Sequence, residues 1–127
     1  MAAPLDVVAN FLNSCTKDRG SFHDLVRRHF TAETVWENVG LSVTTGPDEA
    51  IGLMDQFEAK MGIAGLTVDT LTIAASGNKV LTERIDYFWK ANGDSAGQLR
   101  VMGIFEVAGD KIVSWQDYFD TAAFSNG

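Results

Sequence analysis

The chain of 127 residues is predicted to form an α+β domain, because two different periodicities divide its apolar residues. Up to about residue 62, these residues recur at the spacing of a helix face. From residue 66 onward they alternate with polar residues, and turn signals at 76–78, 92–94 and 108–110 separate four apolar runs. The helices should therefore pack on one face of a curved antiparallel sheet, which can form the wall of a pocket.

Two short helices are expected before the first strand. Pro4 is placed to open the first helix, and the stretch Asp18-Arg19-Gly20 should end it. Ser21, with Asp24 three residues later, resembles the capping arrangement of a second helix. The apolar face of the first helix comprises Val7, Val8, Phe11, Leu12 and Cys15, and that of the second comprises Phe22, Leu25, Val26 and Phe30.

A strand over residues 34–39 and a longer helix should follow. The sequence Thr45-Gly46-Pro47-Asp48-Glu49 is a strong helix start, because proline suits the first turn and acidic residues favour the positive end of the helix dipole. An apolar stripe then precedes Gly62, where the helix should end. Its members are Ile51, Met54, Phe57 and Met61.

Composition narrows the class of protein. The length suits a single domain over residues 1–127, and 46% hydrophobic and 21% charged residues are ordinary for a globular chain. Seventeen acidic against ten basic residues give a charge of −7 without a basic patch, so we expect no nucleic acid partner. We find no apolar run that could span a membrane and no signal peptide, and one cysteine fits a reducing compartment. We therefore expect a cytoplasmic protein that has no membrane partner.

Several polar residues fall on strand faces that otherwise read as buried. Side chains two residues apart in a strand point to the same face, so the faces can be read from the sequence. Three faces mix polar and apolar residues. The face on the early strand contains Trp36 and Asn38, that on the run 80–89 contains Val80, Thr82, Arg84, Asp86 and Phe88, and that on the last strand contains Val113, Trp115, Asp117 and Phe119.

Arg84, Asp86 and Asp117 are the members of this set that could perform chemistry. A buried charge is costly unless it is paired, and two carboxylates around one arginine are neutral only if one keeps its proton. Such a cluster would hold one acid and one base at neutral pH. The alternative interpretation is that Arg84 pairs with an aspartate at the sheet edge while the others point to solvent. Spacing alone leaves both open.

Three stretches resemble a known family. They are Glu37-Asn38-Val39 with the following Gly-Pro helix start, Thr82-Glu83-Arg84-Ile85-Asp86, and Leu99-Arg100-Val101-Met102-Gly103-Ile104-Phe105 with the ending Gly109-Asp110-Lys111-Ile112-Val113-Ser114-Trp115-Gln116-Asp117-Tyr118-Phe119-Asp120. Together they are similar to the limonene-1,2-epoxide hydrolase family, which has the NTF2-like, or SnoaL-like, cone-shaped fold. The resemblance implies N-terminal helices packed on a strongly curved mixed β-sheet around an internal pocket, and a homodimer.

The resemblance also implies a role for each polar residue. Asp117 matches the family's general base, which takes a proton from water, and Asp86 matches the acid that protonates the epoxide oxygen. Arg84 would lie between them and hold both with its fixed fork of N–H groups. Asn38 matches the asparagine that positions the water, and Trp36 stands where the family usually has a tyrosine, offering only an N–H donor. Opening an epoxide this way needs no metal and no organic cofactor.

Apolar residues near this cluster should form the pocket walls and favour a small or medium hydrophobic epoxide. The same residues could instead be simple core. His23 and His29 do not share a helix face as metal ligands would, and Cys15 falls in a stripe typical of core. The candidate pocket residues are Val80, Phe88, Leu99, Val101 and Phe119.

Hydrolysis of an epoxide to a vicinal diol is the leading hypothesis for function. Related cone-fold enzymes include isomerases, cyclases and dehydratases that use the same carboxylates, and Trp36 favours this alternative because it changes the water site. A non-catalytic small-molecule binding or dimerisation module is a third hypothesis. The retained acid, arginine and acid set argues against that third hypothesis.

Overall fold

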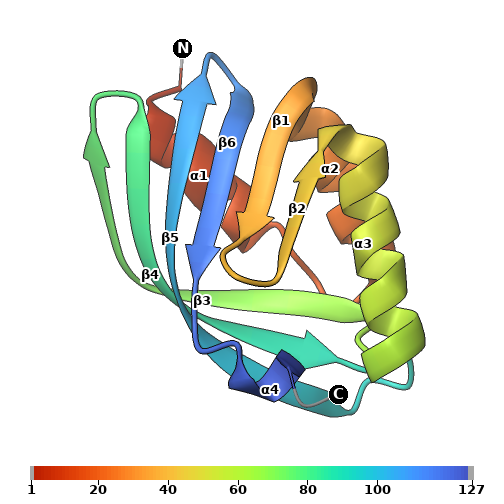
Figure 1. Ribbon diagram of the computed structural model, residues 1–127. Coiled ribbons are helices and arrows are strands. Elements are labelled where there is room, and N and C mark those ends of the chain that lie inside the picture. Colours follow the sequence, from red (N-terminus) through yellow and green to blue (C-terminus); the bar gives the residue numbers. More distant parts are fainter. Residues whose placement is uncertain (1, 126–127) are drawn as a thin grey trace.

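The computed structural model describes residues 2–125, in which helices pack on one mixed sheet (Figure 1). None of the helices in this range is long and apolar enough to cross a membrane. In chain order the elements are α1 (Pro4–Asn13), α2 (Arg19–His29), β1 (Phe30–Asn38), β2 (Ser42–Thr45), α3 (Gly46–Met61), β3 (Gly65–Ser76), β4 (Lys79–Trp89), β5 (Ser95–Ala108), β6 (Lys111–Tyr118) and α4 (Ala122–Ser125).

The six strands form one sheet in the order β2-β1-β6-β5-β4-β3. Strands β1 and β6 pair in parallel and every other neighbouring pair is antiparallel, so the sheet is mixed. The predicted meander of four antiparallel strands is confirmed as β3 to β6. The long strands β3, β4 and β5 bend along their length in Figure 1, so the sheet curls, but β2 and β3 remain free edges. The predicted combination of helices and a strongly curved sheet is therefore confirmed.

The first two helices bury most of the predicted stripes, but their ends differ from the prediction. The first helix ends at Asn13, before Cys15 and before the predicted stop at Asp18-Arg19-Gly20. The N-cap of α2 is Asp18, whose carboxylate accepts a hydrogen bond from the Gly20 amide at 2.9 Å. Ser21, the predicted cap, lies inside the helix and donates its hydroxyl to the Asp18 carbonyl at 2.7 Å. Phe30 is buried, as expected of the apolar face, but it begins β1 instead of ending the helix.

The third helix follows its predicted signals at both ends. Pro47 lies in the first turn of α3, and the chain leaves the helix at Gly62. Gly62 has a φ of 72°, a left-handed conformation that other residues rarely adopt. This helix contacts β1 and β2 and so covers one end of the interior face of the sheet.

Aromatic rings fill the space between the sheet and the first two helices. The Trp115 ring of β6 stacks on Trp36 of β1, with centroids 4.9 Å apart, and on Phe105 of β5, with centroids 5.1 Å apart. Phe11 of α1 meets Trp115 edge-on at 5.5 Å. Because aromatic pairs have preferred geometries, this stack fixes β1, β5 and β6 relative to one another.

The start of β6 departs from the predicted alternation. Val113 is expected on the buried face with Trp115, but Ile112 is the fully buried residue there and Val113 is half-buried. The pairing of β5 with β6 shifts register between Glu106 and Val107, and such an irregularity puts one residue out of step. From Trp115 onward the predicted face holds.

Candidate active site

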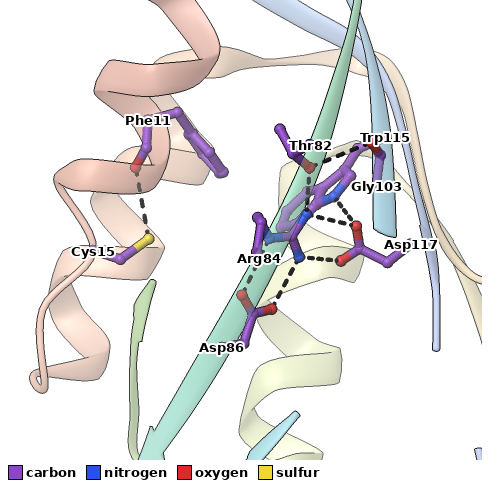
Figure 2. Close-up of polar contacts among 8 residues, drawn as sticks. All are labelled: Phe11, Cys15, Thr82, Arg84, Asp86, Gly103, Trp115 and Asp117. Carbon is purple, nitrogen blue, oxygen red and sulfur yellow. Dashed lines mark hydrogen bonds and ion pairs between the residues drawn. The ribbon is translucent and has the colours of Figure 1, made fainter. Parts of the chain in front are cut away.

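Arg84 lies at the centre of the candidate site, on the interior face of β4. Only 1% of the residue is exposed, and all five N–H groups of its guanidinium donate hydrogen bonds (Figure 2). Four of these bonds go to two carboxylates, and the fifth goes from Nη1 to Thr82 Oγ1 at 3.2 Å. Arg84 is therefore held in one orientation by neighbours on every side.

Asp86 and Asp117 each accept two hydrogen bonds from this guanidinium. Asp86 accepts from Nε at 3.1 Å and from Nη2 at 2.9 Å. Asp117 accepts from Nη1 at 3.0 Å and from Nη2 at 2.9 Å. One planar group thus clamps two buried carboxyl groups, a geometry that suits arginine and not lysine. The structure brings all three residues together and excludes the alternative in which they are solvated.

The strand order explains how these residues meet. Asp86 is two residues beyond Arg84 and so faces the same side of β4. Asp117 comes from β6, which is separated from β4 by β5, so the arginine side chain crosses β5 to reach it. The long side chain of arginine makes this crossing possible.

Trp115 is a part of the cluster that the sequence analysis assigned no role. Its indole Nε1 donates a hydrogen bond to Asp117 Oδ1 at 2.7 Å, and its ring is held between Trp36 and Phe105. Asp117 therefore accepts three hydrogen bonds from side chains, two from Arg84 and one from Trp115. The position of Trp115 on the face of Asp117, two residues away, is the signal that could have identified it.

Burial and charge oppose each other in this cluster. Burial alone would lower the pKa of Arg84, but the two carboxylates outweigh it and raise that pKa above its ordinary value. Burial raises the pKa of Asp117, Arg84 and the Trp115 hydrogen bond oppose the rise, and Asp86 adds to it. One positive charge cannot neutralise two carboxylates, so a proton shared by the pair makes the cluster neutral.

Two residues of β1 lie beside Asp117. The parallel pairing places Asn38 opposite Asp117 and Trp36 opposite Trp115. Asn38 donates through Nδ2 to Ser42 Oγ at 3.1 Å, and this bond does not use its acceptor atom, Oδ1. Trp36 is 4% exposed, and its indole Nε1 has no hydrogen-bond partner in residues 2–125. Both residues line the same cavity as the two carboxylates.

This cavity has a volume of about 50 Å³ for the centres of water-sized molecules and is mostly apolar. Asp86 and Asp117 line it, whereas Arg84 does not. Of the predicted wall residues, Phe88, Leu99, Val101 and Phe119 line it, but Val80 does not. Val80 belongs to the solid core instead. Lining residues that were not predicted as part of the pocket include Leu41, Met54, Phe57, Ile63, Leu66 and Phe124.

The cysteine and the two histidines lie outside this constellation. Cys15 is buried in the core, and burial raises the pKa of its thiol to about 12, with Asp86 adding to the rise and Arg84 opposing it. Its thiol points to the Phe11 carbonyl at 3.6 Å. His23 Nε2 lies 3.4 Å from Asp55, and His29 Nδ1 lies 3.3 Å from the Asp110 carbonyl. None of them lines the cavity.

Comparison with known proteins identifies the family of the chain. Residues 2–126 match the family model of the limonene-1,2-epoxide hydrolase catalytic domain. The chain is 34% identical over 113 residues to epoxide hydrolase EphG of Mycobacterium tuberculosis, covering 89% of this chain and 70% of the relative.

Solved structures support the same grouping. A limonene-epoxide-hydrolase-like epoxide hydrolase from M. tuberculosis superposes with a TM-score of 0.73 at 31% identity, covering 93% of this chain and 79% of the other. A putative SnoaL-like polyketide cyclase from Jannaschia sp. CCS1 also has a TM-score of 0.73, but at 13% identity, covering 95% and 88% of the two chains. That second likeness concerns the fold alone. The chain belongs to the limonene-1,2-epoxide hydrolase family and is an epoxide hydrolase of that type.

Proposed function

We propose that this protein hydrolyses a small or medium hydrophobic epoxide to a vicinal diol in one step, by general acid–base attack of water and without a cofactor. The observation that carries the proposal is the Arg84 guanidinium, which holds two buried carboxyl groups at the wall of an apolar cavity. Because Arg84 lies behind Asp86 and Asp117, it organises the acid and the base without touching the substrate.

Asp117 is the proposed general base. Its Oδ1 accepts from both Arg84 and Trp115, whereas Oδ2 accepts only from Arg84 and keeps a lone pair for a water proton. A water beside it can donate its other proton to Asn38 Oδ1 and accept from the unpartnered Trp36 indole. One lone pair of that water then remains for the epoxide carbon.

Asp86 is the proposed general acid. Asp117 accepts three hydrogen bonds from N–H donors and Asp86 accepts two, and the bonds to Asp117 oppose the rise that burial causes in its pKa. The proposed roles require the proton shared by the pair to lie on Asp86 when water attacks. As water attacks, Asp117 takes its proton, the epoxide carbon–oxygen bond breaks, and Asp86 protonates the released oxygen. Return of a proton from Asp117 to Asp86 restores the starting state.

The cavity supports a substrate with few charges. Phe57, Phe88 and Phe119 contribute apolar surface, and the polar groups of the cavity are concentrated at the carboxylates, Asn38 and Trp36. With a volume of about 50 Å³ the cavity suits a small molecule, and a larger epoxide requires these phenylalanine side chains to move.

We also propose that the protein works as a homodimer in the cytoplasm. The outer face of the sheet exposes large apolar side chains that the chain's own helices leave uncovered, and surfaces of this kind commonly join subunits. They include Val43, Leu81, Met102 and Tyr118. The lone cysteine fits a reducing compartment.

A second candidate is an isomerase, cyclase or dehydratase that uses the same carboxylates. Trp36 favours it, because an indole donates but cannot accept, and a water in this cavity has fewer acceptors than it would beside a tyrosine. If an internal hydroxyl or a carbon acid replaced the water, Asp117 would remove its proton instead.

The experiment that separates these functions measures diol formation from a panel of hydrophobic epoxides. Wild type should form diol, and Asp117→Asn should lose about 10³-fold to 10⁴-fold in kcat because the base is gone. Asp69→Asn, an exposed aspartate on β3, is the matched control and should keep full activity. If wild type forms no diol from any epoxide in the panel, the second candidate takes its place.

A further inference from the structure

Gly103 of β5 lies directly beneath the Arg84–Asp117 pair. The sheet register pairs it with Thr82 on β4 and with Asp117 on β6. Figure 2 shows Thr82, Arg84 and Asp117 gathered around it. A Cβ atom at this position would lie 2.4 Å from Arg84 Nη1, 2.5 Å from Asp117 Oδ1 and 3.0 Å from Thr82 Oγ1. The first two atoms are joined by a hydrogen bond of 3.0 Å. This bond therefore occupies the space that a side chain at residue 103 would fill.

The backbone does not explain why glycine stands here. Gly103 is not among the residues with positive φ, so other residues can adopt its conformation. Glycine in the middle of a strand weakens the strand, because it loses more conformational entropy and contributes no packing. Its presence in a buried strand therefore marks a place where another group must approach the backbone closely.

We infer that Gly103 is a positioning residue for catalysis. It lets the Arg84 guanidinium cross β5 flat against the backbone and grip Asp117 with both Nη atoms. It acts through these two residues and does not touch the substrate, since it does not line the cavity. The inference deepens the proposed function and rests on it for its catalytic part, while the steric part concerns the folded protein alone.

A methyl group at residue 103 would clash with neighbours that cannot easily move away. Arg84 Nη1 is held by Thr82 and Asp117, and Asp117 Oδ1 is held by Arg84 and Trp115. The methyl group would push Arg84 and Asp117 apart. This breaks the Nη1–Oδ1 hydrogen bond and moves the proposed base away from its water. A displacement of about 1 Å at a reacting group costs about 100-fold in rate.

The first test compares Gly103→Ala with Gly52→Ala. Gly52 lies in α3 with open space around its Cβ position, so its variant is the matched control. Gly103→Ala should lower kcat by about 100-fold with little change in KM, and the acid limb of its pH profile should move upward because Arg84 no longer stabilises ionised Asp117 as well. A folded Gly103→Ala with the kcat and pH profile of wild type would overturn the inference.

The second test needs no activity and measures thermal unfolding. Gly103→Ala is introduced into wild type and into Arg84→Ala/Asp117→Ala, which removes both atoms closest to the new methyl group. In wild type it should lower the melting temperature by about 5–10 °C or prevent folding, as overpacking does, whereas in the double variant the loss should be much smaller. Equal losses in both backgrounds would contradict the steric account. Absence of epoxide hydrolysis in wild type would refute the proposed function and leave this second test valid.

Discussion

The two ends of the interior face of β4 differ in what covers them. At one end Val80 is fully buried, and α1 and α2 close the space with side chains such as Phe11 and Phe22. At the other end Asp86 and Phe88 line a cavity. Arg84 lies between these regions, with its guanidinium enclosed and its two carboxylate partners facing the hollow.

This difference shows how the fold keeps a charged group inside a small domain. Unpaired burial of Arg84 would be very costly, but the packed end holds its side chain and the two carboxylates satisfy its charge. The open end then receives carboxyl groups whose orientation is already set. Preorganisation of this kind avoids rearrangement during the reaction.

Replacement of Arg84, which lies between the packed end and the cavity, should have the largest effect on activity. Arg84→Lys keeps a positive charge but loses the fork that holds two carboxylates, so kcat should fall by about 10³-fold while a hydrophobic ligand still binds. Steady-state kinetics and ligand titration measure the two effects. Arg100→Lys, an exposed arginine on β5, should change neither. Near-normal turnover in Arg84→Lys would mean that the fork is not required.

Paired substitutions at the two ends should separate stability from substrate binding. Val80→Ala leaves a hole in the packed end and should cost about 2 kcal/mol in the free energy of unfolding, with KM unchanged. Leu99→Ala enlarges the cavity at the open end and should change KM by about 10-fold with a smaller loss of stability. Denaturant unfolding and kinetics on both variants make the comparison. The distinction fails if the two variants change the same quantity.

The smallest expected effect concerns the hydrogen bond from Trp115. In wild type, kcat/KM should fall as the pH decreases through the pKa of Asp117, because the proposed base must be ionised, and burial raises that pKa. Trp115→Phe keeps a ring in the stack but removes the N–H donor that favours the ionised form. The acid limb of the pH profile should therefore move to higher pH by about half a unit to one unit.

A matched control for this shift lies on β4. Trp89→Phe also removes an indole donor, but its partner is the hydroxyl Thr67 Oγ1 of β3 at 2.9 Å and not a carboxylate of the cluster. Its pH profile should match that of wild type. An unchanged acid limb in Trp115→Phe would show that the indole does not support ionised Asp117.

Strand alternation predicted the shared face of the polar residues because it is a local property. Alternation is regular along β4 from Val80 to Asp86 and along β6 from Trp115 onward, so Arg84, Asp86 and Asp117 could be assigned to interior faces from the sequence. The prediction for Val113 is wrong because the register shift between β5 and β6 depends on the partner strand, which alternation within one strand cannot reveal.

Other parts of the site depend on tertiary packing and were not predictable in this way. Nothing local distinguishes Val80, which the helices cover, from Val101, which lines the cavity. Phe57 of α3 and Phe124 of α4 reach the cavity from elements far along the chain. The role of Gly103 follows from its register with Thr82 and Asp117 and becomes visible only in the assembled sheet.

Under the proposed function, water that Asp117 activates attacks the epoxide directly. The most direct test is a single turnover of excess wild-type enzyme with an epoxide in oxygen-18 water, followed by mass spectrometry of the diol and of the protein. Direct attack of water predicts one labelled oxygen in the diol and none in the protein, with diol formation by Asp117→Asn about 10³-fold to 10⁴-fold slower. Label in an aspartate of the protein, with unlabelled oxygen transferred to the first diol formed, would show a covalent intermediate and contradict the account.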